Sequence, residues 1–209
     1  MYKNLFFDFN GTLLDDCDIS LKILNILTKQ YGLKEVSEEE YLDIFTFPVS
    51  IYYEYLGFKA ENQIEIGAAF HKYYDELSPT EAKVFDSAYY ILNKYQELNL
   101  ICLSASNIDT LTRQLKYYDI YKYFDVVLGL NDKLARSKMK IALDYINNSK
   151  LDKKECVLIG DSIHDYEVAT EMGIDCILVS TGHTSKKRLE TCPCPIIDDL
   201  KELDKYLKI

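Results

Sequence analysis

Apolar residues gather along the chain in short runs that alternate with segments of helical spacing. Short apolar runs are typical of buried strands, and apolar residues that recur every three or four positions are typical of helices. Strands separated by helices of this length favour right-handed crossovers and a parallel sheet. The pattern predicts strands at residues 5–7, 100–103, 126–128, 156–159, 176–179 and 196–197, and helices at 82–98, 107–117, 137–147, 165–172 and 200–207.

The stretch between the first two predicted strands shows helical spacing alone. Acidic residues around Asp16 favour the start of its first helix, because negative charge stabilises a helix N-terminus, and Pro79 is expected to end its last helix. We therefore predict an α/β fold, a Rossmann-like parallel sheet with helices on both faces. Residues 1–15 and 81–209 would form this core, and residues 16–80 an inserted all-helical cap.

Length and composition fit a globular protein. The 209 residues are 48% hydrophobic, and 24 basic against 34 acidic side chains give a formal net charge of −10. Without a basic cluster, nucleic acid and anionic membrane surfaces are disfavoured as partners. No apolar run approaches the roughly 20 residues of a membrane span, and Asp8 interrupts the N-terminal apolar run, so we expect a cytoplasmic protein.

The six cysteines are interpreted as reduced thiols. Cys102, Cys156 and Cys176 lie inside apolar strand-like runs, where buried thiols are common. Cys192 and Cys194 are separated by a single proline and have no second pair, so a structural role is favoured over a metal or redox site.

Polar residues follow directly after three of the predicted strands. Asp8 ends the first strand, and Gly11 permits a tight turn soon after it. Ser104 and Asp161 follow two later strands in the same way. Because ligand sites in parallel sheets form beyond the carboxyl ends of the strands, Asp8, Ser104 and Asp161 are expected to meet in one crevice.

Two carboxylates in one crevice call for a cation. Mg²⁺ prefers hard oxygen ligands and usually takes one or two carboxylates together with water and phosphate. Asp165 lies one helical turn after Asp161 and is a further candidate ligand. Taken alone, the residues from Asp161 to Asp165 also fit a helix cap. The pairing with Asp8 favours the metal.

A metal, a carboxylate nucleophile, a serine hydroxyl and a lysine together indicate phosphoryl transfer, in which catalysis is mostly positioning and charge neutralisation. Lys133, Lys138 and Lys140 all precede the strand at 156–159, and spacing does not choose among them. We favour Lys138, because Ser137 would cap the following helix and place Lys138 in its first turn, at the carboxyl end of the sheet.

Four short motifs occur in order at the predicted strand ends. They are Asp8-Phe9-Asn10-Gly11-Thr12, Ser104, Lys138, and Gly160-Asp161 through to Asp165. Together they resemble the haloacid dehalogenase-like hydrolase superfamily, whose first and fourth motifs are Asp-x-Asp-Gly-Thr and Gly-Asp-x-x-x-Asp. The resemblance covers the whole chain. The small cap and the Ser-Ala-Ser run at 104–106 are similar to the branch that holds phosphoglycolate phosphatase and β-phosphoglucomutase.

The resemblance implies a Mg²⁺-dependent phosphatase for a small phosphorylated metabolite, with a monomer or weak dimer as the expected state. Asp8 would attack the phosphoryl group and form an aspartyl phosphate, which water then cleaves while the cap excludes bulk solvent. The implied catalytic residues are Asp8, Asn10, Ser104 and Lys138, the phosphate-binding residues Phe9, Asn10, Ser104, Ala105 and Lys138, and the metal ligands Asp8, Asn10 through its carbonyl, Asp161 and Asp165.

Asn10 is the one departure from the first motif. Phosphatases of the superfamily have a second aspartate here, which protonates the leaving group and then activates the water. An amide does neither, and general acid–base assistance is worth roughly 10²–10⁴-fold, so turnover should be slow. Restoring aspartate at position 10 should accelerate turnover if this group is the bottleneck.

Asn10 is also compatible with other chemistries of the superfamily. Phosphonate hydrolysis needs a lysine from the cap, and residues 40–58 contain none. Dehalogenation of 2-haloacids needs no Mg²⁺ and would leave Asp161 and Asp165 unexplained. A phosphotransferase, or a weakly catalytic protein that binds a phosphorylated ligand, remains the alternative. His183 follows a strand end and could lend a proton, although a structural role is favoured for it and for His164.

Overall fold

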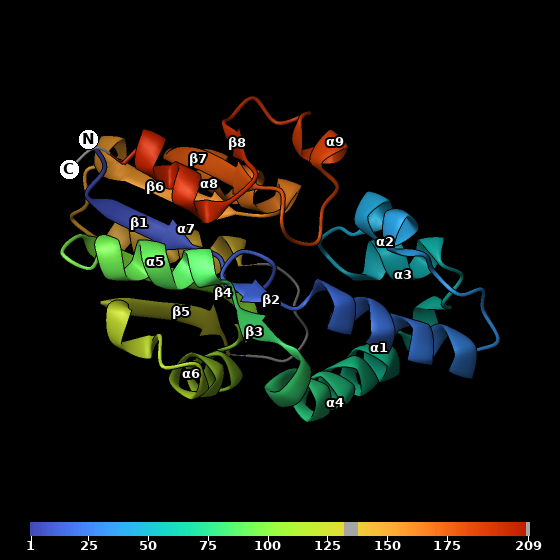
Figure 1. The fold of residues 1–209 in the computed structure, drawn as a ribbon. Helices are drawn as coiled ribbons and strands as arrows, with labels where there is room; N and C mark the ends of the chain where they lie inside the picture. The colour runs from blue at the N-terminus through green and yellow to red at the C-terminus, as the bar shows by residue number, and fades with distance from the viewer. Residues whose placement is uncertain (132–137, 208–209) are drawn as a thin grey trace.

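A six-stranded sheet forms the centre of the computed structural model, which describes residues 1–131 and 138–207 (Figure 1). All neighbouring strands run parallel, and the first strand of the chain lies inside the sheet. The predicted Rossmann-like α/β fold is confirmed. In spatial order the strands are β5 (Val126–Leu130), β4 (Asn99–Asn107), β1 (Asn4–Phe7), β6 (Cys156–Gly160), β7 (Asp175–Val179) and β8 (Ile196–Ile197).

Helices alternate with these strands along the chain. Around the sheet they are α5 (Asp86–Lys94), α6 (Ile108–Tyr117), η2 (Tyr121–Tyr123), α7 (Met139–Asn148), η3 (Lys153–Glu155), α8 (Ile163–Met172), α9 (Lys186–Leu189) and η4 (Leu200–Lys205). Between β1 and α5 the chain forms β2 (Leu14–Asp15), α1 (Cys17–Gln30), α2 (Glu38–Ile44), α3 (Ser50–Tyr55), η1 (Ala60–Asn62), α4 (Gln63–Glu81) and β3 (Lys83–Val84). Across the described ranges, no helix has both the length and the apolar character to cross a membrane.

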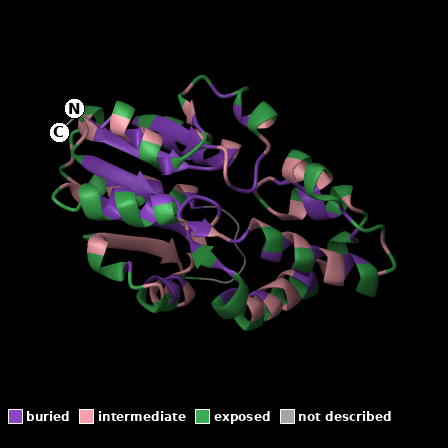
Figure 2. Ribbon diagram, viewed as in Figure 1, coloured by how far each residue is buried: buried purple, intermediate pink, exposed green. Residues whose placement is uncertain are grey.

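Side chains of the strands alternate between two apolar layers. In β1, Leu5 and Phe7 pack with α5, α6 and η4 on one face, while Phe6 packs with α7 and α8 on the other. Successive strand residues point to opposite faces, so a strand covered on both faces must be apolar throughout. The strands β1 and β6 at the centre of the sheet are accordingly fully buried, whereas the edge strand β5 is only partly buried (Figure 2). This explains why the N-terminal run shows no polar alternation.

The helices α1 to α4 lie together beyond the ends toward which the strands of the sheet point (Figure 1). Two short strands connect them to the core: Leu14 and Asp15 of β2 pair antiparallel with Val84 and Lys83 of β3. The two crossings between helices and core are therefore tied to each other. The division at residues 15/16 and 80/81 stays a prediction.

Two predicted helix boundaries were wrong. Helix α4 continues past Pro79 to Glu81, because a proline in the last turn removes one hydrogen bond and the Ala82 amide still donates to Ser78 at 3.0 Å. The helix predicted at 82–98 is shorter, since Lys83 pairs with Asp15 and the helix begins only afterwards. Pairing with a distant segment overrides local helical spacing here.

Smaller differences occur near the C-terminus. The short helix α9 was not predicted, and the last predicted helix is a 3₁₀ helix. All six cysteines are free, and Cys102, Cys156 and Cys176 are buried, as the interpretation of reduced thiols requires.

Phe6 offers a test of the layer between the sheet and helices α7 and α8. Its side chain is fully buried and packs edge-on against Tyr145, with ring centroids 6.0 Å apart. We expect Phe6→Ala to lower the free energy of unfolding by about 3–5 kcal/mol, because the cavity refills only partly. Ile51→Ala, at an exposed site, should change it by less than about 0.5 kcal/mol in the same urea titrations. Equal effects would contradict the assigned core.

Candidate active site

The carboxyl ends of the central strands and the cap helices enclose a cavity of about 1110 Å³. Asp8 follows β1, Ser104 lies in β4 and Asp161 follows β6, and all three line this cavity, as do Asn10 and Lys138. Ala105 also lines it, whereas Phe9 lies fully buried behind the wall. The crevice predicted from the strand ends is therefore present, with the predicted residues around it.

Three carboxylates form a buried cluster at the floor of the cavity. Ligand atoms of Asp8, Asp161 and Asp165 lie within 4.8 Å of one another. The Asp8 amide donates to the Ile159 carbonyl at 2.9 Å, which continues the pairing of β1 with β6 and aligns the two strand ends. Adjacent parallel strands thus deliver two of the three carboxylates to one point.

Asp165 uses its two oxygens differently. Its Oδ2 accepts hydrogen bonds from the Ser162 amide at 2.9 Å and the Ser162 hydroxyl at 2.6 Å, in a capping box at the start of α8. Its Oδ1 lies 2.5 Å from Nζ of Lys138. The helix-cap and cluster interpretations of this motif therefore both apply, one to each oxygen.

The structure describes two of the three candidate lysines, Lys138 and Lys140, and of these Lys138 reaches the cluster. Its buried ammonium pairs with Asp8 and Asp165 and lies 3.3 Å from the Leu103 carbonyl. Lys140 points away: its side chain is 85% exposed and pairs with Asp144 on the same helix. Lys133 and Ser137 lie outside the described residues. Lys138 itself occupies the N-cap position of α7, which begins at Met139, so the prediction that Ser137 is the cap and Lys138 lies in the first turn was wrong.

Asp161 is held between a hydroxyl, an amide and two glycines. Thr12 donates to its Oδ1 at 2.9 Å, and the His183 amide donates to its Oδ2 at 2.7 Å. A Cβ on Gly11 or Gly182 would lie 2.4 or 2.2 Å from Oδ2 of Asp161, and Gly11 also has a φ of +74°. Only glycine fits at these two positions while Asp161 keeps its place.

Burial and mutual repulsion shift the pKa values of the cluster. Burial raises the pKa of Asp8 well above its usual range, with Asp165 and Asp161 adding to the effect and Lys138 opposing it. Burial also raises the pKa of Asp161 to about 6. Burial acts in the same sense on Asp165, but Lys138 and Ser162 hold its pKa below the usual value. Lys138 therefore offsets the burial of Asp165 but not that of Asp8, and the pKa of Asp8 stays raised.

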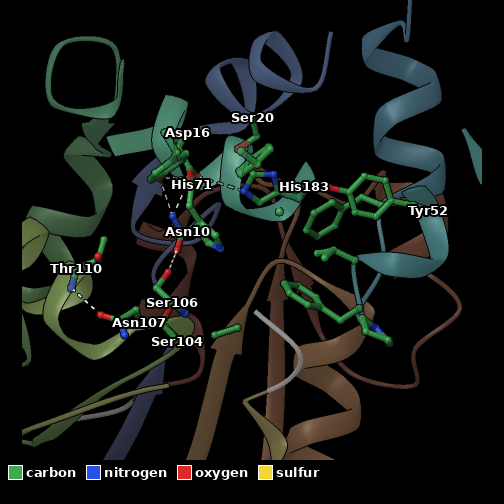
Figure 3. Close-up of a pocket in the computed structure, with 18 of the residues that line it drawn as sticks. Asn10, Asp16, Ser20, Tyr52, His71, Ser104, Ser106, Asn107, Thr110 and His183 are labelled. Carbon is green, nitrogen blue, oxygen red and sulfur yellow. Dashed lines mark hydrogen bonds and ion pairs between the residues drawn. The ribbon is translucent and has the colours of Figure 1, made fainter. Parts of the chain in front are cut away.

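The side chain of Asn10 is fully engaged (Figure 3). Its Nδ2 donates to Oδ2 of Asp16 at 2.7 Å and to the Tyr74 hydroxyl at 2.8 Å, and its Oδ1 accepts from the Ser106 hydroxyl at 3.0 Å. Tyr74 belongs to α4 and Ser106 to β4. The amide therefore joins the core to the cap.

Asp16 is the main site residue that the sequence did not reveal. It occupies the N-cap position of α1, but its side chain makes no capping hydrogen bond. Its Oδ1 instead accepts from the Gly11 amide at 2.9 Å and faces Nε2 of His183 at 3.2 Å, and its Oδ2 also accepts from Tyr74 at 2.5 Å. Its place at the start of α1 agrees with the prediction, but its hydrogen-bond partners come from other segments, which the sequence did not reveal.

His183 completes this network. Its Nδ1 lies 2.9 Å from the Tyr41 hydroxyl of α2, and its ring stacks on Phe45. Burial alone would lower the pKa of His183, but Tyr41 and Asp16 raise it well above its usual value. Burial alone would raise the pKa of Asp16, but His183, Tyr74 and Asn10 lower it. The two side chains are therefore a buried ion pair near neutral pH.

The charges of the described site residues fit a divalent cation. Buried carboxylates of Asp8, Asp16, Asp161 and Asp165 face the cations Lys138 and His183. When all four carboxylates are ionised, as metal binding requires, two negative charges among these residues are left without compensation. Clustered carboxylate oxygens are the donors that a hard cation such as Mg²⁺ prefers.

Known proteins are similar to this chain in sequence or in fold. Pyrophosphatase PpaX of Listeria monocytogenes is 26% identical over 172 residues, which cover 78% of this chain and 76% of that protein. A 5′-nucleotidase of Pseudomonas aeruginosa is 22% identical over 193 residues, 90% of this chain and 87% of that protein. A haloacid dehalogenase-like family hydrolase from Streptococcus pneumoniae has the same fold, with a TM-score of 0.85 at 19% identity over 99% of both chains.

A family model described as haloacid dehalogenase-like hydrolase matches residues 5–179, which include most of the core and the whole cap. The resemblance inferred from the four motifs is confirmed, and the chain belongs to the haloacid dehalogenase-like hydrolase family.

Proposed function

We propose that the protein is a Mg²⁺-dependent phosphatase that hydrolyses a small phosphorylated metabolite through an aspartyl-phosphate intermediate. The observation that carries this proposal is the buried cluster of Asp8, Asp161 and Asp165 around Lys138, at the floor of a cavity that the cap covers. The pyrophosphatase and 5′-nucleotidase relatives act on phosphorylated compounds, which supports the same class of substrate.

Asp8 is the nucleophile in this proposal. Of the three clustered carboxylates, it has the most accessible side chain next to Lys138, at 12% exposed against 1% for Asp165. The ammonium of Lys138 fixes the orientation of the Asp8 carboxylate and favours its ionised form. Such positioning supplies a large part of the rate in phosphoryl transfer.

Polar groups around Asp8 would hold the transferred phosphate. The Ser104 hydroxyl oxygen accepts from the Ser106 amide at 3.1 Å, so its own hydrogen can point to a phosphate oxygen. Lys138, the backbone at Ala105 and the backbone of Phe9 and Asn10 are the further proposed contacts. Asp8, Asp161, Asp165 and the Asn10 carbonyl would hold Mg²⁺, which neutralises phosphate charge when bound.

Asn10 and Asp16 favour slow hydrolysis of the intermediate. Asn10 cannot exchange a proton, and both oxygens of Asp16 already accept hydrogen bonds from Gly11, Asn10 and Tyr74. A carboxylate with a lowered pKa and saturated oxygens is a poor base. This observation favours a second function, in which a long-lived aspartyl phosphate passes its phosphoryl group to an acceptor other than water.

The first test measures turnover of p-nitrophenyl phosphate with Mg²⁺ and with EDTA. We expect metal-dependent hydrolysis, and we expect Asp8→Asn to lower kcat by at least about 10³-fold, since the nucleophile is lost. Lys140→Ala should leave kcat unchanged, because Lys140 is exposed on the far side of α7. Beryllium fluoride with Mg²⁺ should raise the melting temperature of the natural protein but not of Asp8→Asn.

Absence of metal-dependent turnover, together with no effect of Asp8→Asn, would overturn the phosphatase proposal. Stabilisation by beryllium fluoride without turnover would instead support the phosphate-binding or phosphotransfer alternative.

The second test concerns pH. Metal ligands must be deprotonated, and without metal the pKa of Asp161 is about 6 and that of Asp8 is raised as well. Mg²⁺ affinity, measured by calorimetry, should therefore fall as the pH drops through about 6, where protons compete with the metal for Asp161. An affinity that stays constant down to pH 5 would contradict the assignment of Asp161 as a ligand.

The third test exchanges the groups at positions 10 and 16. In Asn10→Asp alone, a second carboxylate would face Asp16 at the distance of the present 2.7 Å hydrogen bond. We expect this variant to lose about 1–3 kcal/mol of stability, so its kcat alone does not isolate the effect of the missing acid–base group. The double variant Asn10→Asp with Asp16→Asn restores one donor and one acceptor. It should recover only part of the lost stability, because it also removes the carboxylate that faces His183, and it should raise kcat by about 10²-fold or more.

Urea titrations measure the stability of the two variants, and p-nitrophenyl phosphate kinetics measure their kcat. A single variant that is as stable as the natural protein, or a double variant that is no faster, would show that the pair is not what limits turnover.

A further inference from the structure

The cavity above Asp8 is much larger than a phosphate group. Its volume of about 1110 Å³ lies just above the roughly 300–1,000 Å³ typical of sites for drug-sized ligands. A phosphate ester of a two-carbon acid, or pyrophosphate, would leave most of this space to water. The cavity size therefore points to a bulky leaving group.

Aromatic side chains of the cap form the walls of this cavity. Phe70 and Tyr74 of α4 lie with their rings nearly parallel, 16° apart, and Phe47 packs edge-on against Phe45 on the side of α2 and α3. Tyr52 lines the same side (Figure 3). Aromatic faces favour flat rings, which stack on them or meet their edges. Phe47 and Phe70 are only partly buried, so their surfaces are available to a ligand.

One buried amide beside these rings has no ordinary partner. Gln114 of α6 is 7% exposed, lines the cavity and lies near the Tyr74 hydroxyl. Neither its Nε2 nor its Oε1 makes a hydrogen bond of normal geometry within the described part of the chain. Buried amides are rarely left in this state, because an unsatisfied polar group is costly. A polar group on the ligand would satisfy it.

The charges on the cap argue against a second anionic group. Among the described residues that line the cavity, the lysines are Lys138, which is already paired with Asp8 and Asp165, and Lys72 on α4. Asp75 and Glu76 line the cavity close to Lys72 along the same helix. The cap wall therefore carries no excess of positive charge to hold a carboxylate or a second phosphate.

We propose that the substrate is a phosphate monoester whose leaving group carries a flat ring with a polar edge, as a nucleoside monophosphate does. The ring would lie against Phe70 and Phe47, and its polar edge would bind Gln114. This inference rests on the proposed phosphatase function and narrows its substrate class. It makes Phe47, Phe70 and Gln114 the residues that select the leaving group, while Asp8 and Lys138 act on any phosphate.

The test compares kcat/KM for four substrates: 2-naphthyl phosphate, uridine 5′-monophosphate, phosphoglycolate and pyrophosphate. We expect both ring substrates to exceed both small ones by at least about tenfold, the effect of burying one flat apolar group. Phe47→Ala and Phe70→Ala should each lower kcat/KM for the ring substrates by about tenfold and for phosphoglycolate by less than about threefold.

Gln114→Leu keeps the size of the side chain and removes its polar atoms. It should lower kcat/KM for uridine 5′-monophosphate by about tenfold and leave 2-naphthyl phosphate unchanged or improved, because the naphthyl ring has no polar edge. Tyr55→Ala is the matched control. It also removes a cap aromatic, but Tyr55 is 68% exposed and lies away from the cavity, so all four values should stay the same.

Two results would overturn the inference while leaving the phosphatase function intact: phosphoglycolate or pyrophosphate as the best substrate, or equal losses on all four substrates in Phe47→Ala and Phe70→Ala. Failure of the phosphatase function itself would look different, since none of the four substrates would then show metal-dependent turnover.

Discussion

Buried negative charge is the constraint on which the rest of this structure depends. The carboxyl edge of the sheet gathers four aspartates in a space that water reaches poorly, and such groups are costly unless each is paired or hydrogen-bonded. The described chain meets this requirement with two cations brought from separate segments. Lys138 comes from the start of α7, and His183 from the loop after β7.

The cap is held to the core by the same charges that the site needs. Asn10 of the core donates to Tyr74 of α4 and to Asp16 at the start of α1, and Tyr41 of α2 lies within hydrogen-bonding distance of His183. The loop after β7 adds direct contacts to α2, with the Ser185 amide donating to the Leu42 carbonyl at 3.1 Å. Movement of the cap must therefore break hydrogen bonds to the Asp16–His183 pair. Access to the cavity and the electrostatics at its floor are coupled through one network.

The local pattern of apolar and polar residues predicted the strands and the polar residues near their ends, because each of these depends on a single segment of the chain. The apolar run before Asp8 indicated a strand buried on both faces. The polar residues after two other apolar runs predicted that Ser104 and Asp161 lie at the carboxyl edge of the sheet, although β4 continues past Ser104 to Asn107. Spacing could not separate Lys138 from Lys140, because two positions along a helix differ by orientation and only the fold decides which faces the sheet.

Features that depend on pairs of distant segments were not accessible from the sequence. Asp16 looked like one of several acidic residues at a helix start, and its partner His183 is 167 positions away. Gln114 sits on a strongly amphipathic helix, where a polar residue is expected to face solvent, yet it is buried beneath the cap. In both cases the packing of the inserted helices onto the core supplies the missing information.

Asn10 takes on a different meaning in this setting. From the sequence it is a lost acid–base group, but in the structure it is the group that a buried carboxylate at position 16 requires. Asp16 accepts from it, Tyr74 accepts from it, and Ser106 donates to it, so each polar atom of the amide has a partner. A carboxylate at position 10 could not donate to Asp16 without a bound proton. Asparagine at position 10 therefore allows the hydrogen bonds that hold the cap against the core. Slow hydrolysis would follow, because the same residue cannot act as an acid or a base.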